Sequence, residues 1–160
     1  MGEYDELLTI LLAQESELQF SEFSNETALE VGLALLKAAR DLGKAVTIDI
    51  TRNGQQLFHY SMNGTSADND SWVRRKSNTV QRFGRSSYAM GIALKNAGLS
   101  IEQKYLLPES EFAPHGGSFP LSIRHVGVVG TITVSGLPQA EDHELVITTL
   151  RAFLAKKPQL

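Results

Sequence analysis

Apolar residues in the first third of the chain recur at helical spacing. Residues 4–19 predict a helix, with leucines clustered at positions 7, 8, 11 and 12. Ser24 can cap a second helix that runs to Leu42, and Gly43 can end it in the left-handed conformation. The apolar stripe of this second helix predicts burial of Leu29, Leu33, Leu36 and Ala39.

The spacing then changes to two, which is typical of a strand with one buried face. Val46, Ile48 and Ile50 alternate with polar residues, Asn53-Gly54 is a strong hairpin turn, and residues 56–62 form the return strand. With a two-residue turn, His59 lies opposite Ile48. We therefore expect an imidazole on the apolar face of this hairpin, satisfied by a hydrogen bond.

The remaining pattern predicts two helices, then strands, then a last helix. The third helix starts at Ser71 and is interrupted at Gly84. The fourth is capped by Ser86 or Ser87 and stops at Gly98. Residues 101–107 fit a helical turn or a strand, 121–124 and 128–134 are strands, and 139–156 is a helix. This order indicates an α+β domain around a mostly antiparallel sheet, with residues 1–20 as an N-terminal helical arm and 21–160 as the domain.

Composition excludes several classes of protein. The chain has 160 residues, 42% of them hydrophobic and none of them cysteine. It can therefore bury a core, and it lacks the ligands for disulfides, thiolate metal sites and iron–sulfur clusters. No apolar run reaches the length of a membrane span, and the acidic N-terminus is unlike a signal peptide. We expect a cytoplasmic protein that makes no membrane contact.

Charge is distributed unevenly along the chain. Residues 1–36 contain eight acids and no Lys or Arg, whereas residues 72–85 contain five bases and no acid. Outside 72–85 the chain has 15 − 5 = 10 bases against 18 acids, a net charge of −8. A long polyanion would meet this negative charge, so we expect no nucleic-acid partner.

The basic segment lies on a predicted helix, and helical geometry places its arginines on one face. Arg74, Arg75, Arg82 and Arg85 share an arc of roughly 120° with Asn78 and Gln81. Guanidinium groups in this arrangement suit carboxylates or phosphates. The alternatives are a solvated face, or pairing with the acids of residues 1–36 in the same chain or in a neighbouring subunit.

Two glycine-containing loops next to strands are the other candidates for ligand contact. One contains His115, Gly116 and Gly117, and the other contains Ser135 and Gly136. Glycine lets the backbone approach a ligand closely, although plain turns would use glycine too. No nucleotide-binding, hydrolase or zinc-protease motif is present, so the residues alone specify no reaction.

Three strings of the sequence resemble a known family. They are WVRRKSNTVQRFGRSSYAMG (72–91), EQKYLLPESEFAPHGGSFPL (102–121) and VGVVGTITVSGLPQAEDHELV (126–146). Together they resemble an uncharacterised branch of the GlcG/HbpS-like superfamily, often called the haem-degrading domain. The resemblance implies a profilin-like domain with a five-stranded antiparallel sheet and helices on both faces. It also implies homo-oligomers that bind haem or a corrinoid.

These observations favour a small-molecule binding protein over an enzyme. Its ligand would be an anionic cofactor whose carboxylates meet Arg75, Arg82 and Arg85, with the loops at 115–118 and 135–136 lining the pocket. The first alternative is a haem-degrading enzyme, for which His115 or His59 would be the proximal ligand. The second is an assembly module without a ligand, in which the basic helix binds the acidic N-terminal segment of another subunit.

Overall fold

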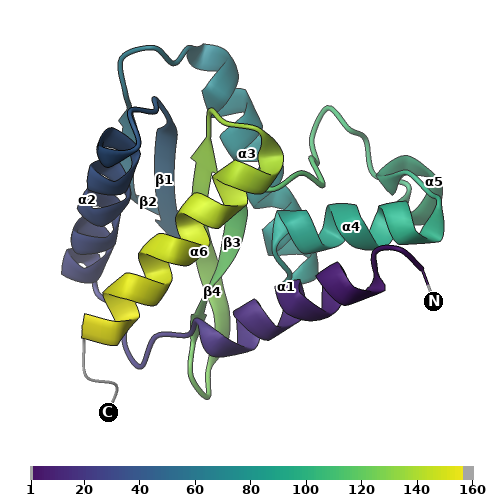
Figure 1. Cartoon of the computed structure of the whole chain (residues 1–160), viewed down its shortest axis with the longest axis horizontal. Coiled ribbons are helices and arrows are strands. Elements are labelled where there is room, and N and C mark those ends of the chain that lie inside the picture. Colours follow the sequence, from purple (N-terminus) through teal and green to yellow (C-terminus); the bar gives the residue numbers. More distant parts are fainter. Residues whose placement is uncertain (1, 157–160) are drawn as a thin grey trace.

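The computed structural model describes residues 2–156, which contain six helices and four strands joined by loops (Figure 1). In chain order they are α1 (Asp5–Glu17), α2 (Asn25–Asp41), β1 (Thr47–Arg52), β2 (Gln55–Ser61), α3 (Ala67–Phe83), α4 (Ser87–Ala97), α5 (Ile101–Tyr105), β3 (Ser118–Ile123), β4 (Gly127–Ser135) and α6 (Gln139–Lys156). None of the helices within 2–156 combines the length and the apolar character needed to cross a membrane.

The sheet has four antiparallel strands in the order β2-β1-β4-β3. The expectation of five strands is therefore wrong. The segment 101–107, which fitted a helical turn or a strand, begins as α5, because Ser100 caps it and Gln103 returns the capping bond. Only a single-residue bridge, between Phe20 and Ile123, extends the sheet beyond β3.

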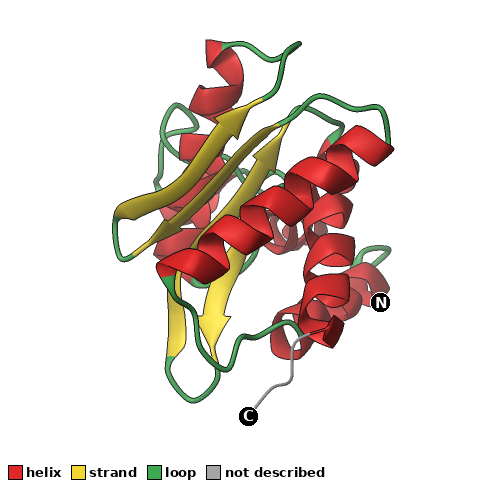
Figure 2. Ribbon diagram, turned by 90° about the vertical axis from the view of Figure 1, so that its left-hand side faces the viewer, coloured by secondary structure: helices red, strands yellow, loops and turns green. Residues whose placement is uncertain are grey.

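Helices cover both faces of the sheet, as expected (Figure 2). α2 and α6 pack on one face and enclose the main core, where Ile48, Ile50 and Ile132 are fully buried. α3 packs on the other face. Fully burying a side chain of this size contributes roughly 1.5–3 kcal/mol, so the α2–α6 face supplies much of the stability.

The face of the sheet under α3 is polar, although it is buried. Thr47, Asp49 and Thr133 are all 5% exposed or less, whereas the alternation in β1 predicted only one buried face. Hydrogen bonds connect much of this layer: the hydroxyl of Thr133 lies 3.0 Å from that of Ser77 on α3 and 2.8 Å from that of Ser118 on β3. A buried layer of this kind is costly unless it is paired, and here it fixes α3 on the sheet.

A β-bulge overturns the expected position of His59. The turn at Asn53-Gly54 has two residues, as predicted, but the register shifts between Ile50 and Thr51. As a result His59 pairs with Asp49, not with Ile48. Because one extra residue in a strand moves every later side chain to the opposite face, the imidazole lies on the polar face.

The predicted helix ends are largely confirmed, but two helices differ in detail. Ser24 and Ser86 cap α2 and α4, and Gly84 and Gly98 adopt the left-handed conformation that ends α3 and α4. α3 begins earlier than predicted, at Ala67, because Ser66 is its cap.

The buried stripe of α2 also differs from the prediction. Leu36 and Ala39 are buried as predicted, but Leu29 and Leu33 are 43% and 50% exposed. The other buried residues of the helix are Ala28, Val31, Gly32 and Leu35. Among them is Gly32, where a Cβ atom would collide with the Phe58 ring.

The N-terminal helix α1 packs against α4 of the same chain. Leu11 is buried between Ala89 and Ile92, and the Glu15 carboxylate accepts a hydrogen bond from the Ser86 backbone N–H at 3.1 Å. Just beyond the helix, Phe20 belongs to the main core. The acidic segment is thus held by contacts within its own chain.

Candidate functional site

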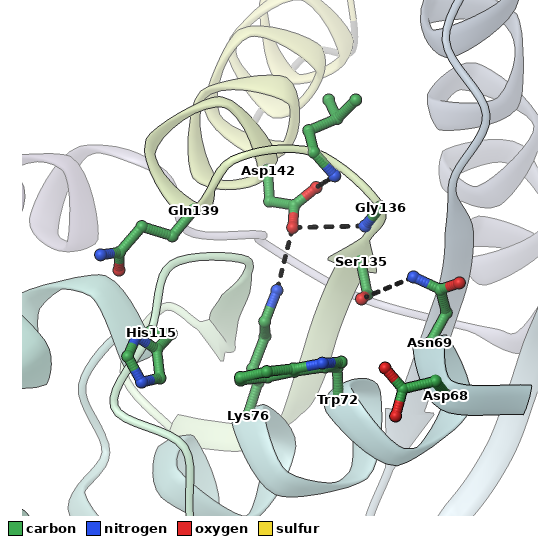
Figure 3. A pocket seen from close by; sticks show the side chains of 10 residues that line it. Asp68, Asn69, Trp72, Lys76, His115, Ser135, Gly136, Gln139 and Asp142 are labelled. Atoms are coloured by element: carbon green, nitrogen blue, oxygen red, sulfur yellow. Dashed lines mark hydrogen bonds and ion pairs between the residues drawn. The ribbon is translucent and has the colours of Figure 1, made fainter. Parts of the chain in front are cut away.

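A pocket of about 350 Å³ opens where the C-terminal end of β4 meets α3 and the start of α6 (Figure 3). Three segments that are distant in sequence form it. They contribute Asp68, Asn69, Trp72 and Lys76 from α3, His115 from the loop before β3, and Ser135, Gly136, Leu137, Gln139 and Asp142 from the end of β4 and the start of α6.

Lys76 forms the floor of this pocket and is only 3% exposed. It lies one turn after Trp72 on α3, and its Nζ donates to the Val134 carbonyl at 3.2 Å and to the Asp142 carboxylate at 3.0 Å. An ammonium group has three donors, so these two bonds leave one further N–H. The pair connects α3 to α6 around the end of β4.

Asp142 is placed by the loop that leads into α6. Its carboxylate accepts from the backbone N–H of Leu137 at 2.9 Å and of Gly136 at 3.4 Å. Burial raises the pKa of Asp142 and lowers the pKa of Lys76, and in each case the partner opposes the shift. Desolvation therefore weakens the charge of both members of the pair.

Gly117 makes room for the Lys76 amine. Its φ of +139° is unfavourable for other residues, and a Cβ atom there would lie 2.6 Å from Lys76 Nζ and would also collide with the Val134 carbonyl. A glycine is required at this position because the backbone passes directly beside the ammonium group.

Two aromatic rings line the same pocket. The rings of Trp72 and His115 meet edge to face with centroids 5.6 Å apart, and the Arg75 guanidinium lies over the Trp72 ring at 4.0 Å. Burial lowers the pKa of His115, and the charges of Lys76 and Lys95 lower it further. The imidazole is therefore neutral at neutral pH and available as a ligand or a hydrogen-bond partner.

The mouth of the pocket is polar. Asn69 donates to the Ser135 hydroxyl at 3.2 Å, and the Gln139 side-chain carbonyl accepts from the Gly116 N–H at 3.0 Å. Figure 3 shows Asp68 and His115 on opposite sides of the opening, with Trp72 and Lys76 between them. A ligand here would meet hydrogen-bonding groups at its rim and an aromatic wall.

The structure brings most of the predicted site residues together. His115, Ser135 and Gly136 line the pocket, Gly116 and Gly117 lie directly behind it, and Arg75 reaches it through Trp72.

Arg82 and Arg85 do not line this pocket. Arg82 is in the last turn of α3, and Arg85 follows the end of that helix, where its guanidinium lies 3.9 Å from the Glu15 carboxylate. Arg74, also on the predicted basic arc, pairs with Glu111 at 2.8 Å.

Trp72, Lys76 and Asp142 were absent from the predicted site. One signal for Lys76 was present in the sequence: it follows Val73 by three residues and precedes Val80 by four, so it lies on the apolar stripe of α3. A lysine on a buried stripe needs a buried partner. Nothing in the local sequence identifies that partner as Asp142, which is 66 residues away.

A second polar cluster lies on the same face of the sheet, beside a cavity of about 460 Å³. His59 connects two carboxylates there, Asp49 at 2.9 Å and Asp70 at 3.1 Å. Within residues 2–156, no three His, Asp or Glu side chains are arranged to hold a metal ion. This cluster ties β1 and β2 to α3.

Comparisons with known proteins identify the family of this chain. A profile of the family described as "Haem degrading protein HbpS-like" matches residues 23–151. A UPF0303 protein of Paraburkholderia phytofirmans is 50% identical over 147 residues, which cover 92% of this chain and 89% of that protein.

Solved structures share the fold. The crystal structure of the Ybr137w protein is similar, with a TM-score of 0.86 and 34% identity, covering 93% of this chain and 88% of that one. A crystal structure of a PduOC:Heme complex has a TM-score of 0.68 at 17% identity, over 81% of this chain and 94% of that one. At 17% identity this likeness shows the fold alone.

Proposed function

Because this chain belongs to the HbpS-like family, we propose that it is a small-molecule binding protein for an anionic, planar cofactor of the haem or corrinoid type. The observation that carries the proposal is the convergence of Trp72, His115 and Lys76 on one pocket. The PduOC:Heme complex, which has the same fold, supports haem as the first ligand to test.

The residues of the pocket fit an edge of such a cofactor. His115 offers a neutral imidazole, as an axial ligand must be, and Arg75 offers a guanidinium for a propionate beside an aromatic surface. At about 350 Å³ the pocket is near the lower limit of ligand sites, so it would hold part of a tetrapyrrole and leave the rest at the surface. Bound haem would supply an iron centre that takes axial ligands and changes oxidation state.

Titration of the purified protein with haemin tests the proposal. We expect a saturable shift of the Soret band at micromolar haemin, and a loss of about tenfold or more in affinity for His115→Ala, because one axial bond is removed. The matched control is His125→Asn. His125 lies in the turn between β3 and β4 at positive φ, a conformation that asparagine tolerates, and this variant should bind as the wild type does.

Two results would contradict this function. The absence of a saturable shift would exclude haem, and an equal loss of affinity in both histidine variants would exclude the pocket as the site. Loss of the Soret band with a reductant under oxygen, beyond that of free haemin, would instead favour the alternative of a haem-degrading enzyme.

Self-association is part of the same proposal. On the outer side of α2, Leu29 and Leu33 are one turn apart and about half exposed, and they form an apolar surface that a second copy would cover. The alternative docking of the basic helix on the acidic arm of another subunit has less support, since Arg85 lies near Glu15 of its own chain. We therefore place the contact between copies on α2.

A further inference from the structure

The chain contains two lysine–aspartate pairs of similar geometry in opposite environments. Lys37 and Asp41 on α2 lie 2.8 Å apart, with side chains 78% and 65% exposed. Lys76 and Asp142 lie 3.0 Å apart, with side chains 4% and 2% exposed. The first pair is an ordinary surface ion pair. The second lines a pocket, so a ligand inside that pocket reaches an amine that bulk solvent barely touches.

Burial changes the chemistry available to the second pair. An amine that loses its hydration holds its proton less tightly, and a buried carboxylate holds one more tightly; the pKa values of Lys76 and Asp142 are shifted in these directions. Transfer of one proton across the 3.0 Å hydrogen bond from Lys76 Nζ to Asp142 Oδ2 turns the ion pair into a neutral amine beside a protonated carboxyl group, a nucleophile next to an acid. Lysines in such surroundings are those that form Schiff bases.

We propose that Lys76 forms a covalent imine with a small aldehyde or ketone that enters the pocket, and that Asp142 transfers the protons. The proposal rests on this pocket being a ligand site, as the proposed function requires, but not on haem as the ligand. Asp142 has the position for this role because its Oδ2 atom accepts the Lys76 hydrogen bond.

The step balances without a further reagent. The lone pair of the Lys76 amine attacks the carbonyl carbon, and the carbonyl oxygen takes the proton of the Asp142 carboxyl group. The nitrogen then returns a proton to that carboxylate. Asp142 next protonates the new hydroxyl group, which leaves as water while the nitrogen lone pair forms the C=N bond. The Asp142 carboxylate then takes the proton that remains on the imine nitrogen. Amine and carbonyl compound are consumed, and imine and water are formed.

The walls of the pocket restrict the carbonyl compound. Trp72 and His115 offer flat surfaces beside the amine, which suits an aromatic or other planar substituent on the carbonyl carbon. Asp68, Asn69 and Gln139 line the opening, which suits hydroxyl or amide groups at the far end of the molecule. The pocket volume of about 350 Å³ is large enough for a small metabolite.

Reductive trapping tests the inference on the whole protein. Benzaldehyde and sodium cyanoborohydride convert each imine to a stable secondary amine, and peptide mapping by mass spectrometry measures the rate of modification at every lysine. At pH 7 we expect Lys76 to react at least about tenfold faster than Lys37, because a positioned acid contributes roughly 10²–10⁴-fold and the Asp142 carboxyl group lies 3.0 Å from Lys76 Nζ inside the pocket. Asp142→Asn should slow the reaction at Lys76 by about a hundredfold, the usual contribution of a positioned acid, and leave that at Lys37 unchanged.

The comparison of Lys76 with Lys37 in the wild-type protein needs no variant, so it decides the matter even if Asp142→Asn does not fold. A rate at Lys76 equal to or below that at Lys37 would overturn the inference. The haemin titration is independent: haem binding with an unreactive Lys76 removes the imine but keeps the proposed function. Selective trapping at Lys76 without haem binding keeps the imine and removes haem as the ligand.

Discussion

His143 on α6 is a buried histidine that makes the stability of the fold depend on pH. Its ring is 2% exposed and packs against Tyr88 and Phe119. Nε2 lies 2.8 Å from the side-chain oxygen of Gln14 on α1, whereas Nδ1 has no hydrogen-bond partner among the described residues. Burial lowers the pKa of His143 to about 4, so the folded protein keeps this ring neutral.

This shift predicts a loss of stability in acid. A histidine with a lowered folded pKa stabilises fully above its unfolded value of 6.5, and its contribution falls as the pH drops from 6.5 to about 4. Over the range from pH 7.5 to 5 we expect the free energy of unfolding to decrease by about 2 kcal/mol from this residue. His143→Gln, which keeps a donor for Gln14 but cannot titrate, should lack that part of the decrease in urea unfolding. The same pH dependence in both proteins would refute the assignment.

Some site residues have a local signal in the sequence, whereas others are placed only by the tertiary fold. The loop glycines and His115 were predictable from the nearby sequence alone. Glycines in a loop allow the backbone to approach a ligand closely, and a histidine beside them is a candidate for ligand contact. The partner of Lys76 was not predictable, because ion pairing across 66 residues depends on the tertiary fold. His59 was misplaced for a similar reason: a bulge has no reliable local signal, and it reverses the face of every residue beyond it.

Most helix caps and helix ends were predictable from the sequence, but only half of the buried side of α2 was. Ser24, Ser86, Gly84 and Gly98 act through local backbone chemistry. The buried side of a helix depends instead on how closely it approaches the sheet. α2 turns Gly32 toward the Phe58 ring and buries Val31 and Leu35 completely, which leaves Leu29 and Leu33 on its outer side.

The leucines left outside by this rotation give a test of self-association. We expect the wild-type protein to have a light-scattering mass of at least two chains of 17.6 kDa. Leu29→Gln/Leu33→Gln should have a smaller mass, because half-exposed leucines contribute more to a contact between copies than to the fold. The control is Leu99→Gln, a comparably exposed leucine outside α2, which should keep the wild-type mass. An unchanged mass for the double variant would place the contact elsewhere.

Across the whole molecule, most of the basic residues of 72–85 make separate contacts with different partners. Arg74 pairs with Glu111, Arg85 lies near Glu15, Arg75 covers Trp72, and Lys76 is buried with Asp142. The basic segment is therefore not one anion-binding face. The class of fold was predictable from the order of periodic segments. The residue pattern itself predicted four strands and left 101–107 open between a helical turn and a strand, and the expectation of a fifth strand came from the family resemblance.

Ferric haemin combined with nuclear magnetic resonance shows whether a ligand binds in the pocket at the end of β4, beside Trp72 and His115. Ferric iron broadens signals steeply with proximity, and the only tryptophan of the chain gives a single indole N–H signal from inside the pocket. We predict that substoichiometric haemin broadens this signal and the amides of Gly116 and Gly136 first. The amides of Gly54 and Gly84, which line a separate cavity, should stay sharp. Early broadening of the Gly54 and Gly84 amides with an unaffected Trp72 signal would contradict ligand binding in the pocket at the end of β4.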